Sequence, residues 1–151
     1  PTIAACRKIQ FSLMNSLKNE LDKMVKDQII TEVTKPTKIV NPITLVKKPN
    51  SNRIRICLDP QTLNKYLCRE HYKLPTFDDI TSNMVGSKYF TTLDAHKGFW
   101  QIPLTENASI LTTFATPYGR YRFLRLPFGL TNSPEIFHKI YSKIFEDIAG
   151  T

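Results

Sequence analysis

Apolar and polar side chains near the start of the chain recur with the period of an α-helix, which predicts a helix over residues 12–28. The apolar positions are Leu13, Leu17, Leu21 and Met24, and polar or charged side chains fill most positions between them. A helix patterned in this way packs one face on a core and leaves the other face in water.

Beyond this helix the apolar positions alternate with a period of two, as in half-buried strands. Two such runs, Ile43 to Lys48 and Arg53 to Asp59, flank Pro49-Asn50-Ser51-Asn52 and predict a hairpin, because asparagine tolerates the conformations of tight turns. In the second run Ile54, Ile56 and Leu58 are expected to point inward, while Arg55 points outward.

Further along, the pattern predicts a short helix over Thr76 to Met84, with Thr76 as its cap and Asp79 three residues later. Residues 87–94 alternate and predict a strand. A second hairpin is predicted from Thr112 to Thr116 and Tyr121 to Leu126, around the turn residues 117–120.

The last predicted element is a helix with a broad apolar stripe. Ser133 is its expected cap, Pro134 occupies its first turn, and Gly150 follows its end. The stripe consists of Ile136, Phe137, Ile140, Tyr141, Ile144, Phe145 and Ile148.

Length and composition indicate a folded protein with one core. The 151 residues suit one domain or a piece of a larger one, and 41% apolar with 11% aromatic residues argues against disorder. The formal net charge of +8 favours a polyanionic partner. Nucleic acid is favoured over a membrane, because no amphipathic basic helix stands out.

The three cysteines, Cys6, Cys57 and Cys68, have no regular spacing, and an odd number does not suggest a secreted disulfide scaffold. The sequence has no run of 18 apolar residues and no signal-peptide pattern at its start. We therefore expect an intracellular protein that is not secreted and has no membrane partner. Because the sequence begins at Pro1, we also expect a segment of a longer product.

The predicted strand 87–94 ends in an acidic residue. Phe90, Thr92 and Asp94 share one face, because successive side chains of a strand alternate. A carboxylate at the end of a strand lies at the rim of a sheet, where it can bind a hard cation such as Mg²⁺. A lone aspartate at such a place can also cap a turn, and this segment alone leaves both roles open.

Asp94 belongs to one of four blocks whose order along the chain resembles the reverse transcriptase of gypsy-type long-terminal-repeat retrotransposons. The blocks are Val46 to Asn64, Leu74-Pro75-Thr76, Phe90 to Leu104 and Phe114 to Phe137. The resemblance covers nearly the whole chain. It implies an RNA-directed DNA polymerase, a nucleotidyltransferase that also copies DNA templates, encoded within a retrotransposon polyprotein.

The resemblance also implies a fold. Together with the predicted hairpins and helices, it points to an α+β fragment, the fingers and the first half of the palm of a right-hand polymerase. The fingers would comprise residues 1–69 and 102–132, and the palm pieces would be residues 70–101 and 133–151.

Two metal ions serve the reaction in this family, and the resemblance implies two Mg²⁺, with Mn²⁺ as an alternative. Asp94 would bind both ions and the backbone carbonyl of Ala95 would bind one. The other catalytic carboxylates form an aromatic-x-Asp-Asp pair after the last helix, and this sequence lacks that pair. Phe77-Asp78-Asp79 looks similar, but it precedes Asp94 at a helix start, where capping is expected. The chain alone is therefore expected to be inactive.

Two cations of the first hairpin are implied to bind the incoming nucleotide. The resemblance places Arg55 on the triphosphate and Lys48 near its γ-phosphate, where both would offset negative charge during transfer. A charged hairpin edge that is merely solvated is the alternative. Ser51 stands where the family commonly has glycine, so the tip of the hairpin departs from the family pattern.

Aromatic and glycine residues complete the implied nucleotide site. Phe99, five residues after Asp94, would lie beneath the sugar and exclude a ribose 2′-hydroxyl, or would pack in the core. Gly98 would let the backbone approach the triphosphate. Phe128 and Gly129 would pack against the incoming nucleotide and the templating base, or would form a structural turn. Phenylalanine at this place is usual for the retrotransposon branch, whereas retroviral enzymes tend to carry glutamine.

Gln61, Asn64 and Pro134 match family positions that touch the template, while Arg120 and Arg122 either contact phosphates or form a solvated face. The implied partners are an RNA or DNA template-primer, deoxynucleoside triphosphates, and the rest of the palm, the thumb and the RNase H of the parent polyprotein. The expected location is the cytoplasm or a virus-like particle.

Two alternatives remain open at this point. The chain could be a non-catalytic nucleic-acid-binding or interaction remnant of such an enzyme. It could also be an incomplete fragment whose exposed apolar helix stripe favours self-association.

Overall fold

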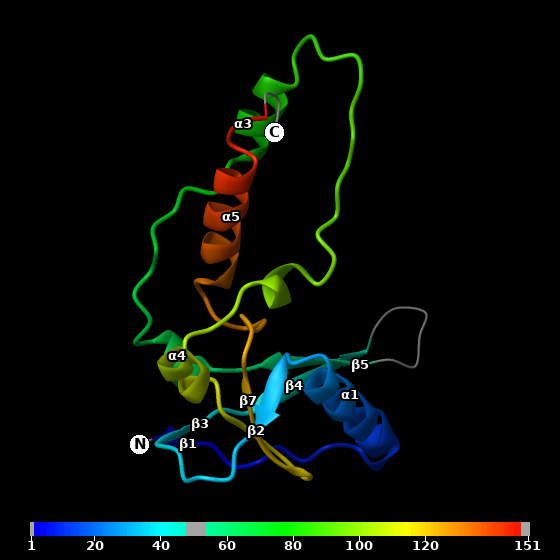
Figure 1. Ribbon diagram of the computed structural model, residues 1–151, viewed down its shortest axis with the longest axis vertical. Helices are drawn as coiled ribbons and strands as arrows, with labels where there is room; N and C mark the ends of the chain where they lie inside the picture. Colours follow the sequence, from blue (N-terminus) through cyan, green and yellow to red (C-terminus); the bar gives the residue numbers. More distant parts are fainter. Residues whose placement is uncertain (1, 48–53, 149–151) are drawn as a thin grey trace.

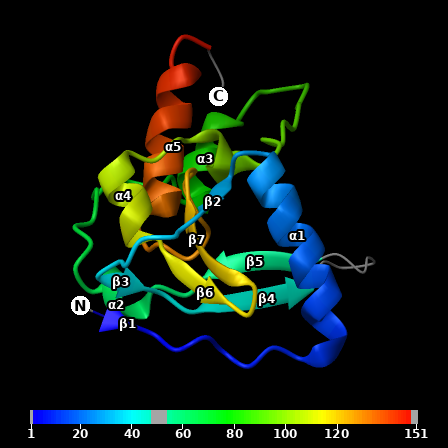
Figure 2. The same ribbon diagram turned by 60° about the horizontal axis from the view of Figure 1, so that its bottom comes forward.

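The computed structural model describes residues 2–47 and 54–148. Figures 1 and 2 show the small sheets with α1 (Met14–Lys26) and α4 (Glu106–Leu111) toward one end of the molecule, and α3 (Phe77–Asn83) and α5 (Ser133–Ile144) toward the other. Helices and antiparallel hairpins occur as separate elements, so the predicted α+β fold is confirmed.

The first predicted hairpin consists of β4 (Ile43–Lys47) and β5 (Ile54–Leu58). The two strands are antiparallel, with Ile43 opposite Leu58 and Lys47 opposite Ile54. Ile54, Ile56 and Leu58 are buried as predicted. Residues 48–53, which include Lys48 and the predicted turn, lie outside the described residues.

The second predicted hairpin belongs to a three-stranded antiparallel sheet with the order β2-β7-β6. Its strands are β2 (Ile30–Glu32), β7 (Gly119–Phe123) and β6 (Phe114–Thr116). β7 begins at Gly119 rather than at Tyr121, and β2 was not predicted, because three residues carry too little periodicity. A short parallel pair joins β1 (Thr2–Ile3) to β3 (Ile39–Val40).

The core lies between these sheets and α1 (Met14–Lys26), which follows the 3-10 turn η1 (Phe11–Leu13). α1 is the helix predicted over residues 12–28, and it packs against β5 and β2. Leu17 and Leu21 from α1 are fully buried, as are Phe114 from β6 and Phe123 from β7. Each buried side chain of this size stabilises the fold by roughly 1.5–3 kcal/mol.

Three short helices were not predicted from the sequence: α2 (Gln61–Asn64), η2 (Gly98–Gln101) and α4 (Glu106–Leu111). Thr105 caps α4, and its side chain accepts a hydrogen bond from the Ala108 N–H. Its Ser109 hydroxyl donates to the Phe123 carbonyl, which ties α4 to β7. Such helices are too short for a 3.6-residue pattern to stand out in sequence.

The prediction of a strand over residues 87–94 is wrong. This segment has no regular secondary structure and runs as part of a long connection between α3 (Phe77–Asn83) and η2, shown in green at the top and right of Figure 1. Tyr89, Phe90 and Leu93 are 93%, 64% and 81% exposed. A strand needs a neighbour for its N–H and C=O groups, and no described residue pairs with this segment.

The capping box predicted for the helix after Leu74 is confirmed in α3. The Asp79 N–H donates a hydrogen bond to the Thr76 hydroxyl. The Thr76 N–H donates a hydrogen bond to the Asp79 carboxylate, with 2.9 Å between nitrogen and oxygen. This backbone hydrogen bond from Thr76 is the main cause that lowers the pKa of Asp79 below its ordinary value.

The last helix, α5 (Ser133–Ile144), differs from the prediction at both ends. Its cap position is Asn132, and Ser133 is the first helical residue, whose buried hydroxyl donates to the Pro127 carbonyl at 3.0 Å. The helix ends at Ile144, so Ile148 lies beyond it, and Gly150 lies outside the described residues.

Ion pairs fasten α5 to the segment that precedes α3. The Arg69 guanidinium pairs with the buried Glu135 carboxylate, and the Lys139 ammonium lies 2.7 Å from Glu70. The hydrogen bond from Arg69 lowers the pKa of Glu135, because it favours the charged carboxylate. No helix in the described parts of the chain is both long and apolar enough to cross a membrane.

Candidate functional site

Four aromatic side chains form a continuous row between η2 and α5. Phe99 lies 4.9 Å from Phe128 and 5.4 Å from Phe137, measured between ring centroids, and Phe137 stacks on Tyr141 at 4.1 Å. We call Phe128, Phe99, Phe137 and Tyr141 the aromatic row. Its rings are half-buried, so part of the row remains accessible to solvent.

Arg55 extends from β5 over the Phe128 end of the aromatic row. Its guanidinium carbon lies 5.2 Å from the centroid of the Phe128 ring, a cation–π contact. Arg55 is exposed, so its N–H groups face solvent and can still bind an anion. The structure therefore brings together three of the predicted nucleotide-binding residues, Arg55, Phe99 and Phe128, from segments far apart in the sequence.

The two predicted glycines are explained by contacts within the protein. A Cβ at Gly98 would lie 3.3 Å from the Phe137 ring, so glycine here lets η2 pack against the aromatic row. Gly129 has φ +110°, and a Cβ there would lie 1.9 Å from the Leu58 carbonyl oxygen. Glycine is the residue that this turn can hold without strain.

The turn that carries Phe128 is fixed by hydrogen bonds from two other elements. The Leu58 N–H of β5 donates to the Phe128 carbonyl at 3.2 Å. The Asn64 amide of α2 donates to the Gly129 carbonyl at 2.9 Å and accepts from the Thr131 N–H at 3.1 Å. The Asn64 side chain, which was predicted to touch the template, thus also holds the turn that carries Phe128.

The other predicted template residues, Gln61 and Pro134, belong to helices next to this turn in the chain or bonded to it. Gln61 is exposed on α2, and its amide is 3.4 Å from the Asp59 carboxylate. Pro134 is exposed in the first turn of α5. Arg122 is engaged elsewhere, because its guanidinium lies 2.7 Å from Glu106 and 3.2 Å from the Ser109 hydroxyl.

Asp94 lies at the end of the long exposed connection before η2. Its side chain is exposed, and no described residue donates a hydrogen bond to its carboxylate. The carbonyl of the following Ala95 accepts a hydrogen bond from the Gly98 N–H at 3.1 Å. No group of three or more potential side-chain ligands that could hold a metal ion occurs in the described parts of the chain.

The turn after Asp94 is tied to the C-terminal end of α1 by an ion pair that the sequence did not signal. Lys97 has the left-handed φ of +54°, and its ammonium lies 2.7 Å from the carboxylate of Asp27. The hydrogen bond from Lys97 lowers the pKa of Asp27 below its ordinary value. Gln101 reinforces the turn by donating to the His96 carbonyl at 2.7 Å.

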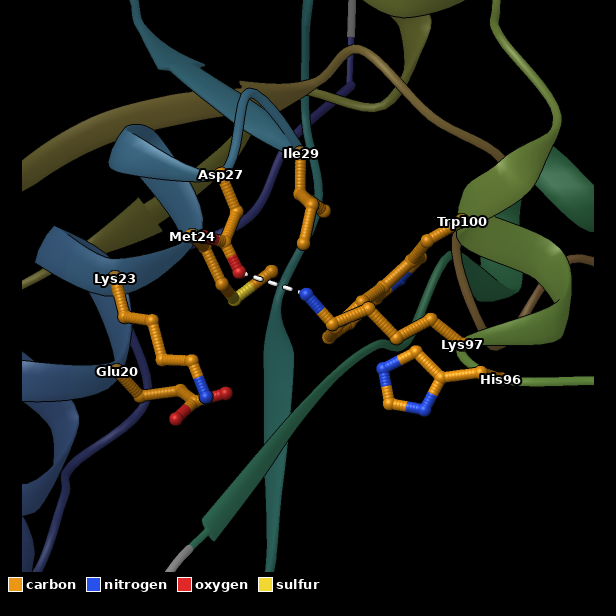
Figure 3. Close-up of a pocket in the computed structure, with 8 residues that line it drawn as sticks. All are labelled: Glu20, Lys23, Met24, Asp27, Ile29, His96, Lys97 and Trp100. Carbon is orange, nitrogen blue, oxygen red and sulfur yellow. Dashed lines mark hydrogen bonds and ion pairs between the residues drawn. The ribbon is translucent and has the colours of Figure 1, made fainter.

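A pocket of about 170 Å³ lies between this turn and α1. Figure 3 shows Lys97 reaching across it to Asp27, with Trp100 and His96 projecting from the same side as Lys97. The indole N–H of Trp100 is buried without a hydrogen-bond partner among the described residues. The ion pair between Lys97 and Asp27 thus spans the pocket.

The chain matches known proteins along most of its length. Residues 46–151 match the family described as "Reverse transcriptase (RNA-dependent DNA polymerase)". The chain is 35% identical over 142 residues to the "Retrovirus-related Pol polyprotein from transposon 412" of Drosophila melanogaster, which covers 91% of this chain and 11% of that polyprotein. It is also 32% identical over 133 residues to the "Enzymatic polyprotein" of cauliflower mosaic virus (strain NY8153), covering 85% of this chain and 20% of that protein.

Solved structures resemble the fold over nearly the whole chain. The foamy viral protease-reverse transcriptase in complex with dsDNA has a TM-score of 0.88 and 26% identity, over 99% of this chain and 31% of that chain. The same foamy viral protein in complex with an RNA/DNA hybrid gives a TM-score of 0.85 at 26% identity, over 99% of this chain and 20% of that chain. In each comparison this chain accounts for less than a third of the protein that it resembles.

Proposed function

The chain belongs to the reverse transcriptase family, and on this basis we propose that it forms the fingers and the first half of the palm of an enzyme that copies RNA into DNA. The fingers would comprise residues 1–69 and 102–132, and the palm pieces residues 70–101 and 133–151. The observation that carries the proposal is the convergence of Arg55, Phe128 and Phe99, the last of which follows Asp94 by five residues in the chain.

The enzyme would be of the gypsy type and would be encoded in a retrotransposon polyprotein. The 35% identity to the transposon 412 polyprotein supports this, and so does phenylalanine at position 128. The cauliflower mosaic virus protein is nearly as similar, at 32%, so the subtype rests mainly on the motifs within the chain.

Arg55, Phe128 and Phe99 would form three sides of the nucleotide site. The Arg55 guanidinium would donate hydrogen bonds to the triphosphate while its flat face remains over the Phe128 ring. Phe99, fixed between Phe128 and Phe137, would lie beneath the sugar and exclude a 2′-hydroxyl. Lys48, which lies outside the described residues, would bind near the γ-phosphate.

Asp94 and the Ala95 carbonyl suit a hard divalent cation such as Mg²⁺ or Mn²⁺, because both offer oxygen and the Asp94 carboxylate is exposed and unpaired among the described residues. Two such ions, when bound, would neutralise the phosphate and activate the 3′-hydroxyl of the primer. Asp94 could bridge the two ions, but one carboxylate cannot complete the coordination of both, so the remaining ligands would come from a part of the enzyme not contained in this sequence.

Template and primer would bind mainly through their phosphates, in keeping with the net charge of +8. Gln61, Asn64 and Pro134 would lie along the template. The related foamy viral enzyme has been solved with dsDNA and with an RNA/DNA hybrid, which supports these partners. Synthesis would take place inside the cell, in the cytoplasm or within a virus-like particle.

Primer extension on an RNA template tests the catalytic assignment. The parent polypeptide that carries this chain should extend the primer, and Asp94→Asn should lower the rate by at least about 100-fold, because the carboxylate charge is lost. Asp78→Asn is the matched control, since Asp78 is also exposed and should leave the rate within about twofold.

Undiminished extension by Asp94→Asn would remove Asp94 from the catalytic site. A wild-type parent that binds template-primer and does not extend it, while retaining its fold, would instead favour the non-catalytic remnant.

A further inference from the structure

The short turn from Pro127 to Thr131 holds one wall of the proposed nucleotide site. Phe128 projects from it into the aromatic row, at 4.9 Å from Phe99 and 6.2 Å from Trp100. The position of this ring therefore depends on what fixes the backbone of the turn.

Contacts on both sides fix that backbone. Leu58 donates to the Phe128 carbonyl, and the Ser133 hydroxyl donates to the Pro127 carbonyl. The Gly129 backbone lies so close to Leu58 that even a methyl group would collide with the Leu58 carbonyl. The turn is thus pressed against β5, and a small change of its backbone would displace the Phe128 ring.

Asn64 contributes two of these contacts with a single side chain. Its amide nitrogen donates to Gly129 and its amide oxygen accepts from Thr131, so both polar atoms face the turn. The α2 helix holds the residue itself, since the Asn64 N–H donates to the Pro60 carbonyl at 2.8 Å. The amide keeps a second N–H and a second oxygen lone pair, but the two hydrogen bonds to the turn fix its orientation.

We propose that Asn64 is a positioning residue, which holds the Phe128 turn in the conformation that receives the incoming nucleotide. This inference rests on the proposed function and gives Asn64 a role different from template contact. Gln61, on the same short helix, lacks such contacts: it is exposed, and its amide is 3.4 Å from Asp59.

A double-mutant cycle in the parent enzyme tests this role. The variants are Asn64→Ala, Phe128→Ala and the double variant, with Thr62→Ala as the matched control, since Thr62 lies on the same helix and has no proposed role in binding. For each we would measure kcat and the KM for deoxynucleotide in primer extension, the Kd for template-primer without nucleotide, and the melting temperature. Asn64→Asp is added because it keeps the shape of the side chain while it replaces the N–H donor with a negatively charged acceptor.

Asn64→Ala should raise the KM for deoxynucleotide about fivefold to tenfold, the effect of losing two hydrogen bonds of ordinary strength. The Kd for template-primer should change less than about twofold. In the Phe128→Ala background, removing Asn64 should have no further effect on KM, because both residues act through the same ring. Asn64→Asp should raise KM at least as much, since it places an oxygen opposite the Gly129 carbonyl.

Different outcomes overturn different conclusions. A higher Kd for template-primer with an unchanged KM would make Asn64 a template residue and overturn the inference. Independent, additive effects of Asn64→Ala and Phe128→Ala on KM would overturn it too. If the wild-type enzyme extends no primer, or if Phe128→Ala leaves KM unchanged, the proposed function itself is wrong.

Discussion

Gly129 links the backbone of the candidate site to its chemistry. Its φ of +110° and its close approach to Leu58 bring the Phe128 ring beside Phe99 and beneath Arg55. The sequence marked Gly129 as a nucleotide-site residue. The structure gives it a packing reason as well, because no side chain fits between the turn and β5.

Gly129→Ala should destabilise the protein by about 3 kcal/mol or more, since it adds a backbone collision to an unfavourable φ. Gly119→Ala is the matched control: its φ is +131°, but a Cβ there would meet no atom within 4 Å. Gly119→Ala should lower the free energy of unfolding by only about 1–2 kcal/mol. Urea unfolding of both variants measures the difference, and equal losses would show that the collision with Leu58 is relieved at little cost.

At the scale of elements, the turn between Asp94 and η2 is held against α1 by charge. Lys97 adopts a conformation that side chains larger than glycine rarely take, and its ion pair with Asp27 joins residues 70 positions apart. Because Asp94 precedes this turn and Phe99 follows it, the ion pair helps to orient both.

Reversing one charge of this pair should therefore lower the primer-extension rate of the parent enzyme. Asp27→Lys and Lys97→Asp should each reduce the rate only about twofold to fivefold, because a solvent-accessible ion pair of this kind is a weak interaction. The double variant, which restores an opposite pair, should recover to within about twofold of the wild type. No recovery in the double variant would mean that each residue acts through other contacts.

At the scale of the whole molecule, the exposed apolar side chains lie unevenly. Many belong to α3 and the connection that follows it, including Phe77, Val85, Tyr89 and Leu93 at 79%, 84%, 93% and 81% exposure. This end of the molecule lies away from the sheets that form the core (Figure 1). Apolar surface of this kind is typical of a face that binds another protein segment.

The 151-residue chain by itself should therefore self-associate, and Leu93→Lys combined with Tyr89→Lys should shift it toward the monomer. Phe11→Lys is the matched control, because Phe11 is also 93% exposed but lies on η1 at the sheet end. Sedimentation velocity over a range of concentrations measures the change. Equal effects of both substitutions would indicate unspecific association.

Much of the fold could be predicted from the sequence, because it depends on local patterns. The periodicity of Leu17, Leu21 and Met24 located α1, the alternation of Ile54, Ile56 and Leu58 located β5, and the spacing of Thr76 and Asp79 located the start of α3. The short elements β2 and α4 were missed, since too few residues repeat within them.

The sequence by itself determined the longer helices, the two hairpins and the residues that are candidates for the site, because periodicity and motif order lie within short stretches of the chain. Only the tertiary structure decided that residues 87–94 are not a strand, since a strand depends on a neighbour that no local pattern specifies. It also decided that Asn64 faces the Phe128 turn and that Lys97 meets Asp27. Each of these contacts joins residues more than 60 positions apart, and their distance in space follows from how the core packs.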